Sequence, residues 1–421
     1  MNVNRALEKK WSQVLPGNVL TELLNPNILT VIDGDILKPD VGMTAREVGI
    51  LKKEVDIIIH TASSINLGRS FGRVANSVID GSEKLARLAL ECEKLKRFVY
   101  VSTAYANSYL YNETDSPDVE VDERFYSLAT KQQPNRDVVE EWMDIKTKGT
   151  SAEYETHDFP WPYAYAKHFT ERLLYKMFCD AGHPEKIMIL RPSIVCAAQK
   201  YPYPGFSIPL STPSLMIAAG IALAPSVNIR MSTRLVNPET QSTFDDVPVD
   251  VVVDRLLDHL VKGSSTIVHA VGGKRSRYTF EVYWRQALQI RRIPWTPKLI
   301  WTRLSWHSPE IHPIPRIFKV IGTSFNFSEK ETERLWDELS DDEKHGLQLF
   351  TAINGEQYDL LSRRDQILST AGWVAKKNGL FARFLYFACY GRSGRYKQQI
   401  PVTYDVRGTP GPEYLHEKDM V

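Results

Sequence analysis

The stretch Val55-Asp-Ile-Ile-Ile-His60, which runs into Thr61-Ala-Ser-Ser64, decides the fold that this sequence predicts. A short run of apolar, β-branched residues is typical of a strand buried on both faces of a sheet. The small side chains that follow predict a tight turn in which a ligand can approach the backbone. The same composition suits any tight turn between a strand and a helix, so the stretch alone does not define a site.

Four more runs of this kind predict strands, and helical patterns separate them. The helix with the clearest periodicity spans residues 82–96, with apolar side chains at the i, i+3, i+4 and i+7 positions. Strands that alternate with helices predict an α/β protein with a doubly wound parallel sheet. The predicted strands are residues 27–33, 98–103, 187–190 and 266–270.

Polar or small residues follow several of these strands. Because ligands bind beyond the carboxyl ends of parallel strands, we expect these residues to line one crevice. The alternative for Asp33-Gly34-Asp35 is a plain turn. The candidate positions are Asp35, Thr61 to Ser64, Ser102 with Thr103, and Pro192 with Ser193.

A tyrosine and a lysine four residues apart, Tyr163 and Lys167, open an amphipathic helix. This spacing places the two side chains on one helix face. A neighbouring ammonium stabilises a phenolate, so we expect the pKa of Tyr163 to fall from about 10 toward neutrality. Such a tyrosine can give a proton to an oxyanion as hydride reaches the carbon.

The bulk composition is that of an ordinary globular protein. Lys plus Arg is 52 against 51 Asp plus Glu, which gives no electrostatic reason to expect a nucleic-acid partner. The four cysteines form no CxxC pair, which favours free thiols in a reducing compartment and no metal site. We therefore expect an intracellular protein, in the cytoplasm or on the cytosolic face of an organelle membrane.

The chain is expected to divide into three parts. Residues 1–275 form the α/β domain, residues 276–395 a smaller helical domain, and residues 396–421 a disordered tail. Within the helical part, Ser328-Glu-Lys-Glu331 predicts a capping box that starts a separate unit reaching Trp373. Earlier in the chain, Asp250 is a plausible cap for the helix that follows it.

The apolar segment Gly379–Tyr390 has two interpretations. It is too short to span a membrane, and it contains Arg383. We favour a helix in the protein core, and the alternative is an interfacial helix that makes a peripheral membrane contact.

The chain resembles the fatty acyl-CoA reductases, extended short-chain dehydrogenases with a C-terminal male sterility domain. The resemblance covers roughly residues 29–375 and depends on the order and spacing of several motifs. These are Gly34-Asp-Ile36, Val55-Asp-Ile-Ile-Ile-His-Thr-Ala62, Val101-Ser-Thr-Ala-Tyr105, Tyr163-Ala-Tyr-Ala-Lys167 with Glu171, Arg191-Pro-Ser-Ile-Val195 with Pro204-Gly-Phe206, Val247-Pro-Val-Asp250, and the block Phe325–Trp373.

The resemblance implies catalytic roles for three residues. Tyr163 would be the acid/base, and Lys167 its partner, which also holds the nicotinamide ribose. Thr103 would be the hydroxyl that binds the carbonyl oxygen, with Ser102 as the alternative.

The resemblance also implies a Rossmann-like cofactor site for NADPH. Asp35 and Ile36 would flank the adenine, while Thr61 and Ala62 would line the dinucleotide. Pro192 and Ser193 would border the nicotinamide. The implied reaction converts long-chain acyl-CoA to fatty alcohol through a bound aldehyde, in two hydride transfers.

Two features depart from the family pattern. The glycines before residue 60 are scattered and form no glycine-rich turn to cradle a pyrophosphate, so we expect the sheet to lack its first βαβ portion. An incomplete sequence of an active enzyme is the interpretation we favour. In addition, Val78 stands where the family pattern has Asn, with Asn76 nearby, and Leu67 stands in place of Phe.

Two other functions remain open. The missing glycine-rich turn is also consistent with a non-catalytic relative that binds acyl chains or a protein partner and no dinucleotide. The second alternative is a reductase whose substrate is an acyl chain on a carrier protein or a sterol-like ketone. The sequence does not predict the oligomeric state.

Overall fold

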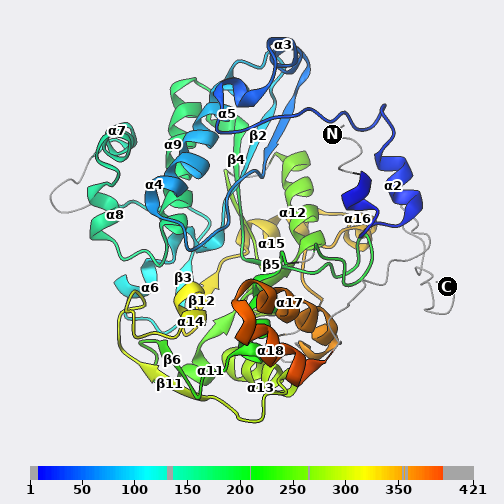
Figure 1. The fold of residues 1–421 in the computed structure, drawn as a ribbon. Helices are drawn as coiled ribbons and strands as arrows, with labels where there is room; N and C mark the ends of the chain where they lie inside the picture. The colour runs from blue at the N-terminus through cyan, green and yellow to red at the C-terminus, as the bar shows by residue number, and fades with distance from the viewer. Residues whose placement is uncertain are drawn as a thin grey trace.

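The computed structural model describes residues 8–129, 136–208, 210–263, 266–352, 355 and 359–391. Its centre is a parallel sheet of four strands in the order β1-β2-β4-β9 (Figure 1). The strands correspond to four of the five predicted apolar runs, and those predictions are confirmed. Their bounds are Ile57–His60 (β1), Arg97–Val101 (β2), Ile187–Pro192 (β4) and Ile267–Ala270 (β9).

Helices cover both faces of this sheet (Figure 1). On one face Phe98 and Tyr100 pack against α5 (Gly81–Leu90) and α9 (Pro162–Asp180). On the other face Val99 and its neighbours pack against α12 (Val249–Lys262). Successive residues of a strand point to opposite faces, so the continuous apolar run in β2 serves both layers. This is the doubly wound arrangement that the sequence predicts.

The predicted strand at residues 27–33 is wrong, because this segment pairs with no strand. A strand needs a neighbour, and among the described residues β1 pairs only with β2. A turn follows the segment, in which the Asp35 amide donates to the Val41 carbonyl at 2.7 Å. Lys84 of α5 also donates to the Leu37 carbonyl at 3.0 Å.

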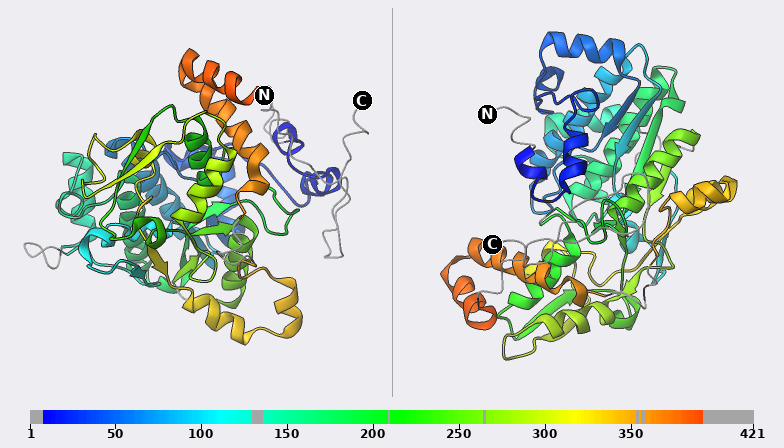
Figure 2. Two further views of the ribbon diagram at one scale, coloured as in Figure 1. Left: turned by 90° about the horizontal axis from the view of Figure 1, so that it is seen from below. Right: turned by 90° about the vertical axis from the view of Figure 1, so that its right-hand side faces the viewer.

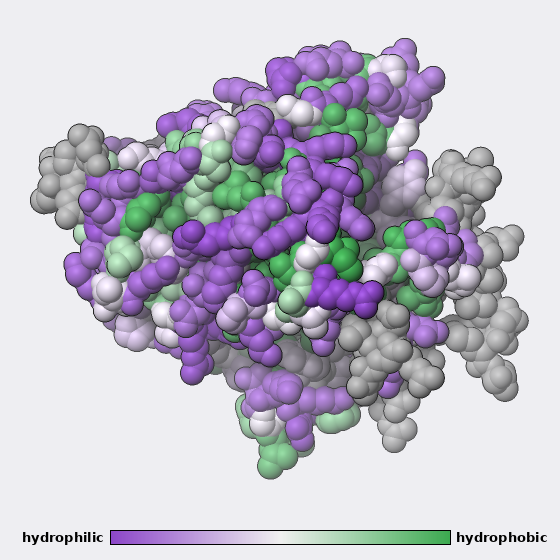
Figure 3. All heavy atoms as spheres, turned by 90° about the horizontal axis from the view of Figure 1, so that it is seen from above, coloured by the Kyte–Doolittle hydropathy of each residue, from purple (hydrophilic) through white to green (hydrophobic). Residues whose placement is uncertain are grey.

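The end of the molecule that carries α3 (Ala45–Glu54) leaves several large apolar side chains exposed. Green hydrophobic patches lie among purple hydrophilic ones in this view (Figure 3). The exposed residues from this part of the chain are Ile28, Ile32, Leu37, Ile50, Ile57 and Ile59. The open edge of β1 and the unpaired 27–33 segment therefore leave apolar surface uncovered.

A second core fills the lower half of the molecule (Figures 1 and 2). It joins α10 (Pro213–Leu223) and α13 (Phe280–Ile290) to α17 (Arg364–Lys377) and α18 (Gly379–Tyr390). The parallel pair of β6 (Asn228–Ser232) and β11 (Lys298–Thr302) lies beside it. Residues before and after position 275 thus share one core, and the predicted boundary there does not separate two packing units.

Short elements complete the fold. The remaining helices are α2 (Gly17–Leu23), α4 (Phe71–Val74), α6 (Leu110–Glu113), α7 (Val138–Lys148), α8 (Ala152–Thr156), α11 (Pro238–Gln241), α14 (Pro313–Ile317), α15 (Lys330–Glu338) and α16 (Asp341–Gly346). The 3-10 and π segments are η1 (Pro39–Gly42), η2 (Ala75–Asp80), η3 (Ala104–Asn107), η4 (Pro184–Lys186) and η6 (Leu361–Arg363). The remaining strands are β3 (Val119–Val121), β5 (Ile194–Cys196), β7 (Thr243–Phe244), β8 (Asp246–Pro248), β10 (Tyr278–Thr279) and β12 (Phe325–Phe327).

The segment Phe325–Trp373 is not the separate helical unit that the sequence predicts. Its first residues form β12, which pairs in parallel with β3. The alternation of Phe325 and Phe327 around Asn326 places both rings in a buried cluster, which is the pattern of a strand. The following helix α15 packs beside α12 and β9, whereas α17 belongs to the second core.

Two predicted caps are also corrected. Ser328 forms no capping box: Glu329 is the N-cap of α15 without a side-chain bond, and the Glu331 amide donates to the Glu123 carboxylate at 2.9 Å. Asp250 lies inside the first turn of α12. Its carboxylate accepts the backbone amides of residues 199–201 at 2.7–3.0 Å, so it anchors a loop.

Two further expectations concern cysteines and the chain end. All four cysteines are free thiols, as predicted. The predicted tail, residues 396–421, lies outside the described residues. Among the described helices, none combines the length and the apolar character needed to cross a bilayer.

Candidate active site

The first turn of α9 brings Tyr163 and Lys167 to the carboxyl end of the sheet. Pro162 occupies the first turn, where its missing N–H costs no hydrogen bond and its fixed φ favours the helix. Small residues Ala164 and Ala166 are fully buried, so α9 packs closely against its neighbours. Lys167 lies one turn after Tyr163, with its ammonium 5.9 Å from the centre of the Tyr163 ring.

Lys167 is held almost out of water, with 2% of its surface exposed. Its Nζ donates to the Val101 carbonyl at 2.8 Å and lies 4.6 Å from the centre of the Tyr100 ring. Burial lowers the pKa of Lys167 to about 7, and the charge of Glu171 opposes that shift. The ammonium is therefore fixed at the end of β2 and exchanges its proton near neutral pH.

Tyr163 does not have the acidic phenol that the sequence predicts. Burial raises its pKa above the usual value of a phenol, so the hydroxyl is protonated at neutral pH. The prediction of a value near neutrality is wrong because desolvation disfavours the phenolate and Lys167 directs its hydrogen bond to Val101. In this arrangement Tyr163 can donate a proton, and it is not a ready base.

The two hydroxyls that follow β2 differ in their hydrogen-bond partners. Ser102 donates to the Glu171 carboxylate, which is occupied with the Arg191 guanidinium. Thr103 Oγ1 donates over a long distance, 3.4 Å, to the Pro192 carbonyl, and it accepts the Tyr105 amide at 3.3 Å. A substrate oxygen can replace that weak contact at little cost, whereas Ser102 belongs to a buried ion-pair network.

The Glu171–Arg191 pair supports the site from within. Each side chain is 1% exposed, and Arg191 Nε lies 3.0 Å from Glu171 Oε1. The pair joins α9 to β4 behind Thr103. It therefore fixes the helix that carries Tyr163 against the strand that carries Pro192 and Ser193.

Two buried rings near Lys167 were not singled out by the sequence. Tyr100 lies beside the ammonium, and His60 ends β1 with its Nε2 2.9 Å from Ser82 Oγ. Burial, with the Lys167 charge as a second cause, lowers the pKa of His60 to about 4. Side chains alternate along β2, and this alternation places Tyr100 on the face that packs against α9. The same pattern in the sequence could have identified Tyr100 as a neighbour of Lys167.

The predicted nicotinamide-side residues lie at the same sheet edge. Pro192 is the last residue of β4, and the Ser193 amide donates to the Ala270 carbonyl of β9 at 3.2 Å. Both are buried, and the Pro192 carbonyl accepts the Thr103 hydroxyl. The residues present thus fit the nicotinamide and ribose end of a dinucleotide.

The predicted adenine-side residues are more open. Thr61 and Ala62 are exposed directly after β1, at the same sheet edge. Asp35 accepts the Leu37 amide at 3.0 Å in a local turn, and Ile36 packs against Gly81, where an added Cβ would lie 2.8 Å from its side chain. Ile36 therefore borders the first turn of α5, which does not by itself provide a pyrophosphate cradle.

The position that departs from the family pattern lies in a π-helical segment. Residues Ala75–Asp80 form η2, and within it Val78 is fully buried among apolar side chains. A π segment accommodates one extra residue in a helix. Asn76, which precedes Val78 by two, is exposed. Val78 therefore serves the core, and the family's polar contact is not made from that position.

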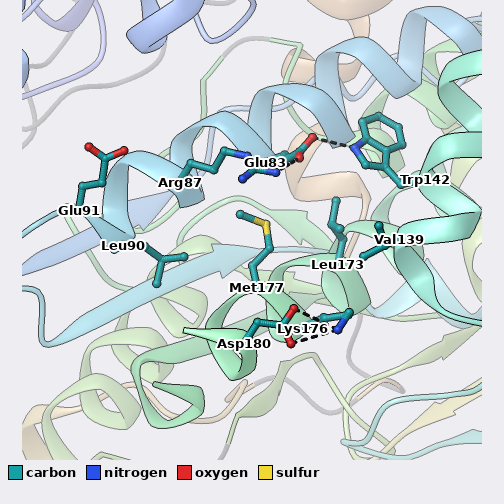
Figure 4. A pocket seen from close by; sticks show the side chains of 10 residues that line it. All are labelled: Glu83, Arg87, Leu90, Glu91, Val139, Trp142, Leu173, Lys176, Met177 and Asp180. Carbon is teal, nitrogen blue, oxygen red and sulfur yellow. Dashed lines mark hydrogen bonds and ion pairs between the residues drawn. The ribbon is translucent and has the colours of Figure 1, made fainter. Parts of the chain in front are cut away.

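A groove on the outer side of α9 is separate from this site (Figure 4). It has a volume of about 440 Å³ and lies between α5, α7 and the second half of α9. At one end Trp142 Nε1 donates a hydrogen bond to the Glu83 carboxylate at 2.7 Å. At the other end Lys176 forms an ion pair with Asp180. Its lining mixes opposite charges that already neutralise one another.

Comparisons with known proteins identify the family of this chain. The family model described as male sterility protein, an NAD-binding family, matches residues 3–256. Fatty acyl-CoA reductase 1 of Xenopus laevis is 28% identical over 230 residues, which cover 54% of this chain and 40% of that protein. The human fatty acyl-CoA reductase 1 is 26% identical over 259 residues, which cover 59% of this chain and 45% of the relative.

Among solved structures, the terminal R domain of the myxalamid biosynthetic pathway is similar with a TM-score of 0.49 and 15% identity, covering 86% of this chain and 78% of that one. The chain spans less than half the length of the curated relatives named above. The matched segment contains β1, β2, β4 and all of α9, and with them every predicted site residue. The chain therefore belongs to the male sterility protein family, the family of the fatty acyl-CoA reductases, and its cofactor is a nicotinamide dinucleotide.

Proposed function

We propose that this chain is the catalytic part of an NADPH-dependent reductase that converts long-chain fatty acyl-CoA to fatty alcohol through a bound aldehyde. The observation that carries the proposal is the meeting of Thr103, Tyr163 and Lys167 at the carboxyl end of β2. The family membership and the names of the relatives support the substrate class.

In the first step the chain would stabilise an oxyanion. The nicotinamide cofactor, when bound, supplies hydride to the thioester carbon. Thr103 Oγ1, released from its long contact with Pro192, and the Tyr163 hydroxyl would donate hydrogen bonds to the carbonyl oxygen. When the tetrahedral oxyanion collapses, the C–S bond breaks, CoA leaves as a thiolate and the aldehyde remains.

In the second step Tyr163 would act as an acid. A second hydride converts the aldehyde to an alkoxide, and the Tyr163 hydroxyl gives it a proton to form the alcohol. A phenol whose pKa is raised by burial is fully protonated beforehand, which suits a donor. The Lys167 ammonium then stabilises the phenolate that remains, and burial strengthens that attraction.

The test compares two tyrosine variants on one helix. Wild type, Tyr163→Phe and Tyr175→Phe are incubated with palmitoyl-CoA and NADPH, and the alcohol is measured by gas chromatography. We expect Tyr163→Phe to lower the rate by roughly 10²- to 10⁴-fold, as for loss of a positioned acid. Tyr175 packs on Phe125 away from the site, so Tyr175→Phe should keep the wild-type rate.

An activity of Tyr163→Phe within threefold of wild type would remove Tyr163 from the mechanism. Turnover of an acyl chain on a carrier protein or of a sterol-like ketone, without turnover of acyl-CoA, would replace the substrate class. We also propose an intracellular location, in the cytoplasm or on the cytosolic face of a membrane, where both substrates of the proposed reaction would be available.

A further inference from the structure

Lys319, His307 and Asp158 form a hydrogen-bonded row at the surface of the molecule. Lys319 Nζ lies 2.8 Å from His307 Nδ1, and His307 Nε2 lies 2.8 Å from Asp158 Oδ1. An ammonium only donates hydrogen bonds, so Lys319 donates to Nδ1, and Nε2 therefore carries the ring proton that is donated to Asp158. The row has the order of a nucleophile, a base and a carboxylate that orients the base.

The carboxylate at the end of the row is held by two further donors. Trp306 Nε1 donates to Asp158 Oδ1 at 3.0 Å, and Asn112 Nδ2 donates to Asp158 Oδ2 at 2.6 Å. Burial opposes ionisation of Asp158, but the hydrogen bonds from His307 and Trp306 outweigh it, and the pKa of this carboxyl falls below its usual value. The negative charge is therefore fixed where it orients the imidazole and stabilises an imidazolium.

Lys319 differs from several paired lysines elsewhere on the surface. Lys52, Lys176 and Lys262 lie against carboxylates, which favour the protonated amine. Lys319 is half-buried and meets an imidazole. Burial lowers the pKa of Lys319 to about 8, and the charge of Asp158 opposes that shift. Part of the Lys319 population is therefore a neutral amine near neutral pH, in contact with a base.

The loop that carries Lys319 is tied to the helix that carries Tyr163. Trp161, the N-cap of α9, donates through Nε1 to the Ile317 carbonyl at 2.8 Å. Val320, the residue after the lysine, packs against the same buried cluster as Tyr163. The row thus lies beside the candidate active site. Its imidazole and carboxylate side chains are 47% and 43% exposed, which leaves the row open to a solute.

We propose that Lys319 is a site of covalent acylation, at which the ε-amine takes the acyl group of a long-chain acyl thioester. The inference rests on the proposed function in one respect, because the electrophile is the substrate class proposed there. The transfer uses neither the nicotinamide cofactor nor the Tyr163 hydroxyl. It adds a modification site outside the residues that carry the reduction.

The transfer balances without an oxidant or a reductant. The neutral amine of Lys319 attacks the thioester carbon, and a C–N bond forms. The amine loses a proton to His307 Nδ1, and Asp158 stabilises the resulting imidazolium. The tetrahedral adduct then collapses, the C–S bond breaks, and the leaving CoA thiolate takes the proton from His307. The products are an amide on Lys319 and the free thiol of CoA.

The experiment follows acylation of the full chain by palmitoyl-CoA without NADPH, so that no reduction takes place. Adducts that survive hydroxylamine are amides, and mass spectrometry of peptides gives the labelled fraction of each lysine over time between pH 7 and pH 9. Lys330 is the internal control, because its side chain is 80% exposed and its ion pair with Asp122 is long, 3.9 Å. His307→Gln and Asp158→Asn are compared with wild type, and circular dichroism reports the fold of each.

We expect Lys319 to be acylated at least about tenfold faster than the more exposed Lys330, because an amine with a pKa of about 8 has a larger neutral fraction at pH 7 than an ordinary lysine. The rate at Lys319 should level off above about pH 8. His307→Gln should slow it by roughly 10²-fold, as for loss of a positioned base. Asp158→Asn should slow it by a smaller factor, because the imidazole keeps its place as a base and loses its countercharge.

Trinitrobenzenesulfonate, which reacts with accessible neutral amines, separates the two parts of the proposal. If both reagents label Lys319 no faster than Lys330, the amine is not an activated nucleophile. Fast labelling by trinitrobenzenesulfonate without transfer from palmitoyl-CoA would remove the acyl thioester as its partner. An unchanged rate in His307→Gln would also overturn the proposal. Alcohol formation in a parallel reaction with NADPH tests the proposed function separately, since its failure would leave formation of the Lys319 amide unaffected.

Discussion

At the scale of single residues, burial determines the chemistry of the site more than the mutual charge of its members. Lys167 and Tyr163 lie close enough to interact, yet desolvation shifts both away from their charged forms. Burial lowers the pKa of the lysine to about 7 and raises the pKa of the tyrosine, so each is shifted toward its neutral form. A negative charge on a substrate oxygen would therefore depend on the hydrogen bonds that the Thr103 and Tyr163 hydroxyls donate to it.

The buried amine predicts a measurable pH dependence of stability. The pKa of Lys167 falls from 10.5 to about 7 on folding, so between these values the unfolded chain binds more protons and stability rises with pH. Lys167→Met removes this contribution. We expect the unfolding free energy of wild type to gain about 2 kcal/mol relative to Lys167→Met between pH 7 and pH 9.

Urea unfolding at pH 7 and pH 9 measures that difference. The same comparison with Lys176→Met, a lysine on the solvent side of α9, provides the control. An equal pH dependence in wild type and Lys167→Met would show that the folded protein keeps this amine protonated up to its ordinary pKa.

Removing one partner of the buried Glu171–Arg191 ion pair should lower the unfolding free energy strongly. Glu171→Gln leaves the buried Arg191 guanidinium without a countercharge, which should cost about 3–5 kcal/mol of unfolding free energy. Glu310→Gln removes the partner of Arg230 in an exposed pair and should cost less than about 1 kcal/mol. Thermal and urea unfolding of the two variants check this contrast, and similar losses would contradict it.

At the scale of elements, the sequence predicts correctly the strands that pair with another strand among the described residues. The strands β1, β2, β4 and β9 and the helix α9 lie where the sequence pattern puts them. The 27–33 segment has the same composition, but no neighbouring strand pairs with it. A strand requires a hydrogen-bonding partner, and a local pattern carries no information about that partner.

Helix caps show the same difference between local pattern and context. Ser328 precedes a glutamate at the right spacing but forms no box, because the Glu123 carboxylate takes the Glu331 amide. Ser340 and Glu343 do form a box at the start of α16. Sequence spacing alone cannot distinguish them, since Glu123 lies more than 200 positions from that amide.

Ser340→Ala should therefore lower stability by about 1 kcal/mol, as for loss of an N-cap, whereas Ser328→Ala should cost about half of that or less. Unfolding midpoints in urea test the pair. A greater loss from Ser328→Ala would mean that this serine stabilises α15 in a way that its long bond to Glu123, at 3.4 Å, does not explain.

At the scale of the whole molecule, the residues at the catalytic end of the site are more deeply buried than those expected at the far end of the cofactor. The residues expected at the nicotinamide are buried and ordered by neighbouring strands, whereas Thr61 and Ala62 are open to solvent. The sequence could predict the first group because motif residues and strand ends coincide. It could not predict the Tyr163 pKa, which depends on packing by distant segments.

We expect the chain to bind NADPH more weakly than a domain with a glycine-rich phosphate turn, with a dissociation constant above about 10 μM, because each lost charge-assisted hydrogen bond to phosphate costs about 1.5–3 kcal/mol. Fluorescence titration of NADPH measures it. Lys167→Met should weaken binding further through the ribose contact, and Lys176→Met should not. Complete absence of binding would favour the alternative function, an acyl-chain or protein-binding relative.

The short parallel pair of β3 and β12 has a consequence for how the molecule folds. It ties together segments about 200 positions apart, and Ser324 donates to Asp118 across a separation of 206. Closing so large a loop loses chain entropy before any contact is gained, so contacts of this range form late and slow the folding reaction. The β2–β4 core would assemble first, and the lower half would acquire its final packing only when this distant pair closes.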